Sequence, residues 1–262
     1  MMIESEVTDT TSADALNRVR GLYLKLLENC LVNTIYEDES ISPANAGRFN
    51  PNVRKRGGDW PAVAHSMIGS ERMFHLRCMC EYAITHKVPG DFIETGVWRG
   101  GASIMMRAVL QTYGVADRTV WVADSFDGLP APDAAKYPAD TGADFHEFRE
   151  LAVSLEEVQE NFAKYGLLDN QVRFLKGWFK DTLPAAPIDK LAVLRLDGDL
   201  YESTMDALTH LYQKLSPGGI VIIDDYIIGC CRSAVHDFRE SEGISEPIQP
   251  IDGTGVFWEK AL

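Results

Sequence analysis

The sequence predicts an α/β fold in which a mostly parallel sheet is covered by helices on both faces. From Asp91 onward, short and nearly continuous apolar runs alternate with stretches that carry apolar residues at helical spacing. A strand that is buried on both faces is apolar throughout, whereas a strand with one solvated face alternates apolar and polar residues. Strands of the first kind, alternating with helices, are typical of a doubly wound parallel sheet.

Five apolar runs are the expected parallel strands, and a sixth segment completes a sheet of about seven strands. Residues 246–260, EPIQPIDGTGVFWEK, contain two short apolar runs around a glycine-containing turn, which predicts an antiparallel hairpin at the sheet edge. The five parallel strands are DFIETG (91–96), TVWVADSF (119–126), VRFLKG (172–177), KLAVLRLDGD (190–199) and GGIVIIDDY (218–226).

Helices are expected between these strands and before the first of them. Ser154 followed by Glu157 is a capping box, so a helix is expected to begin there. Two further helices precede the sheet, so we divide the chain into an N-terminal helical segment (1–90) and an α/β domain (91–262) that form one continuous unit. The polar stretch 129–151 has no helical or strand period and is expected to be a functional loop. The expected helices are 12–36, 70–86, 103–114, 154–166, 203–215 and 233–243.

The composition argues against nucleic acid and membrane as partners. The chain has 25 basic and 39 acidic residues and a net charge of −14, whereas phosphate binding depends on Lys and Arg. Its first residues have neither a basic stretch nor an apolar core of the kind that marks a signal peptide, and no apolar run is long enough to cross a bilayer. Five cysteines without a CxxC pair are expected to be reduced. These features predict a cytoplasmic protein.

Residues that follow the first three strands predict a nucleoside-containing cofactor, because ligands of such sheets bind beyond the carboxyl ends of the strands. Gly96, Gly100 and Gly101 allow a tight turn into a helix after the first strand. Asp124 ends the second strand, where an acidic residue accepts hydrogen bonds from ribose hydroxyls. The sequence lacks G-x-G-x-x-G and GK[ST], which disfavours a dinucleotide or a P-loop site.

Four carboxylates at two strand ends predict a metal site. Asp197 and Asp199 follow the fourth strand, and Asp224 and Asp225 follow the fifth. Strands adjacent in the sheet would bring these groups together, where they would repel one another unless a cation neutralised them. Oxygen ligands without His or Cys suit a hard cation, which is Mg²⁺ before Mn²⁺ or Ca²⁺.

Four motifs taken together resemble the macrocin O-methyltransferase family. They are E-T-G-V-W-R-G-G-A-S, A-D-S-F-D-G-L-P, L-D-G-D-L-Y-E-S-T and V-I-I-D-D-Y, and the resemblance extends from Trp60 to the C-terminus. Members use S-adenosylmethionine and Mg²⁺ to methylate sugar hydroxyls of antibiotics. The resemblance implies a class I, Rossmann-like methyltransferase fold with extra N-terminal helices and a small-molecule glycoside as acceptor. In its narrowest form it implies the 4-hydroxyl of noviose in an aminocoumarin.

The resemblance also implies a role for each matching residue. The catalytic base is our own hypothesis and not part of the resemblance. It is Asp199, two positions after Asp197, although Asp199 could instead be a further metal ligand or orient one, and His65 and His146 are rival bases. Ser66 stands where the family commonly has Thr, which puts a side-chain contact there in doubt. The metal ligands would be Asp197, Asp224 and Asp225. The cofactor would be held by His65, Ser66 and Met67 in a lid, by Glu94, Thr95, Gly96 and Ser103 at methionine, by Asp124 and Ser125 at ribose, and by Trp178, Phe179 and Asp181 at adenine.

Two other functions are compatible with parts of this pattern. A D-x-D sequence at a strand end, here Asp197 to Asp199, also holds the metal and sugar nucleotide of glycosyltransferases, although that function would leave the glycine turn and Asp124 without a role. A methyltransferase-like domain that only binds its cofactor is the non-catalytic alternative. The apolar faces of the N-terminal helix also suggest a homodimer.

Overall fold

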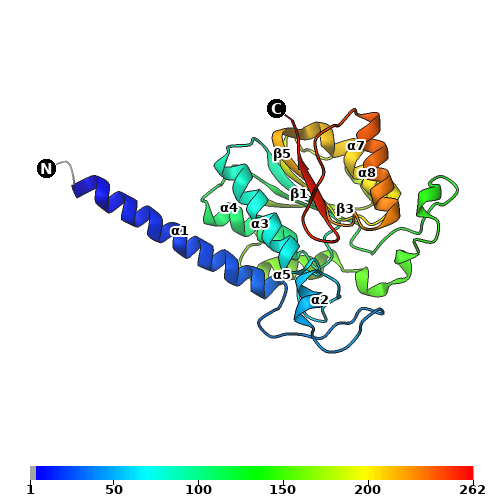
Figure 1. The fold of residues 1–262 in the computed structure, drawn as a ribbon, viewed down its shortest axis with the longest axis horizontal. Helices are drawn as coiled ribbons and strands as arrows, with labels where there is room; N and C mark the ends of the chain where they lie inside the picture. The colour runs from blue at the N-terminus through cyan, green and yellow to red at the C-terminus, as the bar shows by residue number, and fades with distance from the viewer. Residues whose placement is uncertain (1–3, 262) are drawn as a thin grey trace.

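The computed structural model describes the backbone of residues 4–261 and the side chains of residues 13–261, and its centre is a seven-stranded sheet (Figure 1). The strand order is β3-β2-β1-β4-β5-β7-β6. The first five strands of that list pair in parallel, β7 runs antiparallel to β5, and β6 antiparallel to β7. This confirms the parallel sheet with an antiparallel edge hairpin. The bounds are β1 Asp91–Thr95, β2 Val120–Asp124, β3 Val172–Lys176, β4 Leu191–Leu196, β5 Leu215–Ile223, β6 Gln249–Pro250 and β7 Val256–Glu259.

The direction of strand succession reverses between β1 and β4, which are neighbours in the sheet. Thr95 of β1 pairs with Leu196 of β4, and Leu196 pairs with Ile223 of β5. The residues that follow these three strands therefore leave the sheet side by side at one edge. A reversal of this kind is where ligands bind in open α/β sheets.

Helices cover both faces of the sheet, as the apolar strands require. Phe92 packs in a core with α3, α4 and α5, whereas its neighbour Ile93 packs in a second core with α7 and α8, since successive side chains of a strand point to opposite faces. The Ser154 side chain accepts a hydrogen bond from the Glu157 amide at the start of α5, as the capping box predicts. The helices are α3 Gly69–Thr85, α4 Gly101–Thr112, α5 Leu155–Lys164, α6 Phe179–Thr182, α7 Tyr201–Leu211 and α8 Gly229–Ser241.

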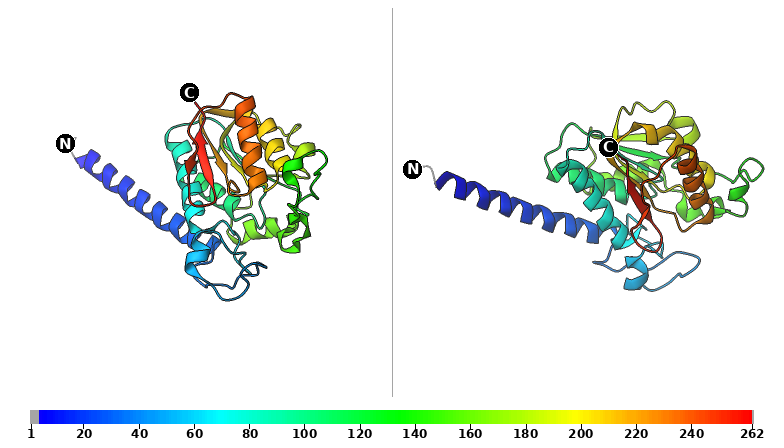
Figure 2. Two further views of the ribbon diagram at one scale, coloured as in Figure 1. Left: turned by 45° about the vertical axis from the view of Figure 1, so that its right-hand side comes forward. Right: turned by 45° about the horizontal axis from the view of Figure 1, so that its top comes forward.

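The N-terminal helix α1, Glu4–Leu31, extends well away from the body of the protein (Figures 1 and 2). It both begins and ends earlier than the expected 12–36. Near its C-terminal end, Leu24, Leu27 and Leu31 are buried in the core that also contains α3 and α4. The segment from 32 to 68 connects α1 to α3 and contains only one short helix, α2 (Pro51–Lys55).

The loop 129–151 contains three short 3₁₀ turns, Pro138–Asp140, Phe145–Glu147 and Arg149–Leu151. Its Asp140 is fully buried and accepts hydrogen bonds from the first amides of α7, those of Tyr201 (2.6 Å) and Glu202 (3.1 Å). A carboxylate at a helix N-terminus satisfies amides that have no partner within the helix. The loop is thereby anchored beside the carboxyl edge of the sheet.

Two general expectations can be compared with residues 4–261. No helix in this range is both long enough and apolar enough to span a bilayer. All five cysteines are free thiols, as expected.

Candidate active site

A pocket of about 900 Å³, including its open mouth, lies beyond the carboxyl ends of β1, β2 and β4. Its walls come from the turns after these strands, from α6, from the first turns of α7 and from the loop 129–151. The pocket therefore contains residues of both predicted sites, Asp124 of the nucleoside site and Asp197 of the metal site. The lining residues are Met67, Gly96, Val97, Trp98, Asp124, Ser125, Gly128, Leu129, Pro130, Leu151, Trp178, Phe179, Lys180, Asp197, Gly198, Asp199, Glu202, Ser203 and Asp206.

The turn after β1 needs glycine for steric reasons. Gly96 has φ +84°, and a Cβ on it would lie 1.6 Å from the backbone oxygen of Asp197 on the neighbouring strand. Gly101, the first residue of α4, donates its amide to the His65 oxygen at 2.8 Å, and a Cβ there would lie 2.4 Å from the same oxygen. One glycine therefore permits close contact between two strand ends, and the other permits contact with the N-terminal segment.

Asp124 is held firmly at the end of β2. Its Oδ2 accepts from the Val97 amide and its Oδ1 from the Phe126 amide, both at 2.7 Å. Burial raises the pKa of Asp124, while these backbone amides act in the opposite direction. Each carboxylate oxygen has a second lone pair, so the side chain can still accept hydrogen bonds from a ligand in the pocket. Ser125 donates its hydroxyl to the Gly128 oxygen at 2.6 Å, which stabilises the turn after Asp124.

The residues predicted for the adenine and lid contacts are only partly brought to the pocket. Trp178, Phe179 and Met67 line it, whereas Asp181 is exposed and does not. His65 is bonded through Nδ1 to the Tyr165 hydroxyl at 2.6 Å, and Ser66 is buried under the same segment; neither lines the pocket. The pKa of His65 is lowered to about 4, mainly by burial.

Three predicted methionine contacts also lie outside the pocket lining. Glu94 is buried, and its carboxylate accepts from the Ser103 hydroxyl and from Arg195. Burial raises the pKa of Glu94 to about 7, with Arg195 opposing this shift. Thr95 is fully buried, and its hydroxyl has no partner in the structure. Glu94 and Ser103 therefore satisfy each other beneath the pocket floor.

Asp197, Asp199 and Asp225 converge at the other end of the pocket. One carboxylate oxygen from each lies within 4.8 Å of the others. The Asp199 backbone is left-handed, with φ +56°, and its amide donates to Asp225 Oδ2 at 3.2 Å. Burial and the neighbouring carboxylates raise the pKa of all three groups, that of Asp199 to about 8. Oxygen ligands in such a cluster fit a hard divalent cation.

Asp224 is oriented differently from the other three acids. One of its oxygens accepts from Arg195 and the other from Arg72, and all three side chains are buried. The structure thus gathers two of the three predicted metal ligands, Asp197 and Asp225, and places Asp199 rather than Asp224 in the nearest set of carboxylates. The reason is that Arg72 of α3 and Arg195 of β4 each bond one oxygen of Asp224 and so hold its carboxylate toward themselves.

Several lining residues were not identified from the sequence. Val97 and Trp98 follow the glycine turn directly, so their position next to Gly96 was a usable signal. Residues of α6 and α7, such as Lys180 and Glu202, carry no such signal because they reach the pocket only through the packing of these helices. The rival base His146 is exposed and does not line the pocket. From the expected functional loop, residues 129, 130 and 151 do line it.

Comparison with known proteins identifies the family. The family described as Macrocin-O-methyltransferase (TylF) matches residues 20–260. An 8-demethyl-8-(2,3-dimethoxy-alpha-L-rhamnosyl)-tetracenomycin-C 4'-O-methyltransferase from Streptomyces olivaceus is 56% identical over 91% of this chain and 92% of its own length. A demethyldecarbamoylnovobiocin O-methyltransferase from Streptomyces niveus is 51% identical over 95% of this chain and 97% of its own length.

A solved structure supports the same family assignment. The O-methyltransferase NovP superposes with a TM-score of 0.88 and 52% identity over 93% of this chain and 100% of its own. These matches are to O-methyltransferases and give no support to the glycosyltransferase alternative. The expected fold, that of class I S-adenosylmethionine-dependent methyltransferases, is confirmed, and the chain belongs to the macrocin O-methyltransferase family.

Proposed function

We propose that this enzyme transfers the methyl group of S-adenosylmethionine to a sugar hydroxyl of a glycosylated natural product. The observation that carries the proposal is that one pocket joins Asp124, Trp178 and Phe179 to the acidic residues Asp197 and Asp199. A donor nucleoside and an acceptor hydroxyl bound in a common pocket would face each other. Holding two reactants in line supplies a large part of the rate of a displacement reaction.

The donor fits the half of the pocket near β1 and β2. Asp124 would accept from the ribose hydroxyls, and Trp178 and Phe179 would flank the adenine. The methionine part would lie along the turn at Gly96, which lines the pocket and where the missing side chain lets a ligand approach the backbone closely. From the predicted lid, only Met67 lines the pocket, and we propose that it contacts the donor directly.

A divalent cation, Mg²⁺ first, fits the acidic half of the pocket. We propose Asp197, Asp224 and Asp225 as its ligands, the set that the family motifs imply. Asp197 and Asp225 already lie together, and Asp224 would ligate through a remaining lone pair of an oxygen that Arg195 or Arg72 also holds. When bound, the cation supplies positive charge that acidifies a nearby hydroxyl. Without it, several buried carboxylates would share only the positive charge of the arginines beneath them.

Asp199 is the proposed base. Its carboxylate lines the pocket and would take the proton of the acceptor hydroxyl as the sugar oxygen attacks the methyl carbon. The carbon–sulfur bond breaks in the same step, and its electron pair stays on sulfur, so the products are the methyl ether and S-adenosylhomocysteine. Two hydrogen bonds fix the backbone of Asp199. Its amide donates to the Asp225 carboxylate, and its backbone oxygen accepts from the Cys230 thiol at 3.3 Å.

The acceptor class rests on the two relatives, which act on a rhamnosyl tetracenomycin and on a novobiocin precursor. The narrowest form of the proposal is the 4-hydroxyl of noviose in an aminocoumarin. The test is a labelled-methyl assay against aminocoumarin, tetracenomycin and macrolide glycosides, with and without EDTA. Methylation of a glycoside that EDTA abolishes and Mg²⁺ restores is the expected result, whereas methylation only of a non-sugar hydroxyl would overturn the proposal.

We also propose a homodimer and a cytoplasmic location. Leu16, Val19, Tyr23 and Leu26 of α1 are spaced by three and four residues and are 39–61% exposed, whereas the opposite stripe packs on the body. Apolar residues at this spacing form the seam of paired helices, and the same stripe on a second copy of α1 is a self-complementary partner. Five free thiols favour a reducing compartment.

A further inference from the structure

The segment 32–68 has little regular structure, so side chains must hold it in place. Within it are the short helix α2, and two isolated bridges that pair Ser40 with Gly47 and with Pro61. Its C-terminal part nevertheless reaches the pocket, because Met67 is one of the lining residues. We call this segment the N-terminal strap.

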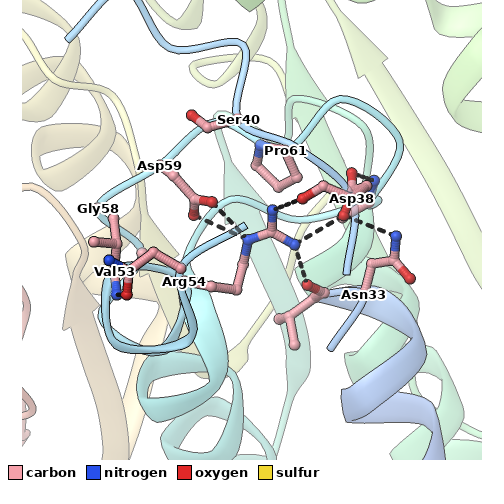
Figure 3. Close-up of polar contacts among 12 residues, drawn as sticks. Asn33, Asp38, Ser40, Val53, Arg54, Gly58, Asp59 and Pro61 are labelled. Carbon is pink, nitrogen blue, oxygen red and sulfur yellow. Dashed lines mark hydrogen bonds and ion pairs between the residues drawn. The ribbon is translucent and has the colours of Figure 1, made fainter. Parts of the chain in front are cut away.

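Arg54 is the centre of the contacts that hold the strap (Figure 3). Its side chain is fully buried. Its Nε donates to both oxygens of Asp59 at 2.9–3.0 Å, and its Nη1 donates to the Val32 oxygen and to Asp38 Oδ1, both at 2.9 Å. Its Nη2 donates to the Asp38 backbone oxygen at 2.9 Å. All three guanidinium nitrogens therefore bond to the strap, at points that lie far apart along it.

Asp38 connects Arg54 to the backbone of Val63 and Ala64, the part of the strap close to Met67. Its Oδ1 accepts from Arg54 and from the Asn33 amide, whereas its Oδ2 accepts from the backbone amides of Val63 at 2.5 Å and Ala64 at 3.0 Å. Only two residues separate Ala64 from Met67. Arg54 thus holds Asp38 at two points, with Nη1 on the carboxylate and Nη2 on the backbone oxygen. Two contacts from one planar guanidinium fix orientation as well as distance, which a single point charge does not.

The next residues continue the connection to the turn after β1. The amides of His65 and Ser66 donate to the Leu31 oxygen, and the His65 oxygen accepts from the Gly101 amide at 2.8 Å. Arg99 donates from Nη1 to the oxygens of Pro61 and Ala64, both at 2.9 Å. Arg54 thus cross-links distant parts of the strap to one another, and the last part of the strap is attached to the end of α1 and to the start of α4.

We infer that Arg54 is a positioning residue for donor binding: through Asp38 it holds the backbone of Val63 and Ala64, and thereby holds Met67 against the donor half of the pocket. The inference rests on the proposed function, because it assigns the donor to that half. If the strap is already ordered, donor binding does not include the entropy cost of ordering it. Donor affinity is therefore higher than it would be with a loose strap. Arg54 itself does not line the pocket.

The test compares Arg54→Lys with Arg107→Met. Arg107 serves as the control because it too is a buried arginine that bonds both oxygens of one carboxylate, that of Asp169, and neither Arg107 nor Asp169 lines the pocket. For each variant we would measure the Kd of S-adenosylhomocysteine by calorimetry, the KM for S-adenosylmethionine and kcat at saturating donor, together with Tm and the rate of proteolysis within 32–68.

Arg54→Lys should raise the Kd and the KM for the donor about tenfold while kcat changes less than about twofold, and it should speed cleavage of the strap. Arg107→Met should lower Tm without changing the Kd. Asp38→Asn, which leaves Arg54 beside Asp59, should reproduce the effect if Arg54→Lys does not fold. An unchanged Kd in the folded strap variants, or an equal rise in Arg107→Met, would overturn the inference. Failure of the unaltered enzyme to bind S-adenosylhomocysteine would instead overturn the proposed function.

Discussion

Arg195 lies directly beneath Asp197 at the end of β4, with its Nη1 2.9 Å from Asp197 Oδ2. The same guanidinium bonds Glu94 on one neighbouring strand and Asp224 on the other. A single buried arginine therefore joins the ends of three strands next to the pocket, and it offsets part of the negative charge there. Its removal would leave Glu94 and Asp224 buried beside fewer cations.

Arg195→Met should therefore be strongly destabilising. Breaking a buried ion pair by removing one partner costs about 3–5 kcal/mol, because an uncompensated charge stays in the interior. Urea unfolding at pH 7 measures this loss. A triple variant that also carries Glu94→Gln and Asp224→Asn should recover part of it, since two of the three carboxylates that lose Arg195 are then uncharged. Failure to recover any would count against the charge argument.

Asp197→Asn and Asp199→Asn should separate metal binding from proton transfer. Asp197→Asn is expected to weaken Mn²⁺ or Mg²⁺ binding and to lose activity with it. Asp199→Asn is expected to keep the metal affinity but to lose about 10²–10⁴-fold in kcat, the usual contribution of a general base. Calorimetric metal titration and the labelled-methyl assay provide the two readouts. An equal loss of metal affinity in both variants would make Asp199 a ligand rather than the base.

Gly96→Ala should disrupt the site, whereas Gly114→Ala should be mild. Both glycines have positive φ, +84° and +66°, but a Cβ on Gly96 would lie 1.6 Å from the Asp197 oxygen while one on Gly114 would meet nothing within 4 Å. The Gly114 variant should lose only the conformational cost of about 1–2 kcal/mol. The Gly96 variant should lose more stability and bind no donor, which thermal unfolding and donor titration would show.

His75 should make the protein sensitive to acid. It packs on Phe257 with ring centroids 4.5 Å apart, neither ring nitrogen has a partner, and burial lowers its pKa from 6.5 to about 4. The unfolded state therefore binds the proton more readily, so the stability that the neutral ring contributes is present above pH 6.5 and lost as the pH falls toward 4. His75→Phe should reduce the loss of unfolding free energy over this range by about 1–3 kcal/mol, as measured by urea unfolding at several pH values.

Charge on the exposed stripe of α1 should separate the proposed dimer. Val19 and Leu26 of this stripe are 61% and 56% exposed in one subunit, so Val19→Glu with Leu26→Glu should leave its fold intact while placing like charges across the seam. Light scattering after size exclusion should then report a monomer, whereas Asn17→Glu, an exposed change on the same helix, should not alter the mass. A monomeric unaltered protein at micromolar concentration would contradict the dimer.

The sequence alone determined the sheet, its antiparallel hairpin and the location of the site at the strand ends. The strands β4 and β5 contain nearly continuous apolar runs, interrupted in β4 only by Arg195, so their burial and the places where they end can be read locally. The acidic residues Asp197, Asp199 and Asp225 then meet because parallel strands end at one edge. Asp124 was identified by the same reasoning, and it lines the pocket.

Only the tertiary structure decided which partner each of these groups has. Asp224 is held by Arg72, which lies 152 positions away along the chain on α3, and Glu94 is satisfied by Ser103 and Arg195 rather than open to the pocket. The strap likewise depends on Arg54 reaching Asp38 and Asp59 across an irregular segment. Local pattern predicts where a chain is buried, but the choice among several buried charges depends on distances in space, which the order of residues does not encode locally.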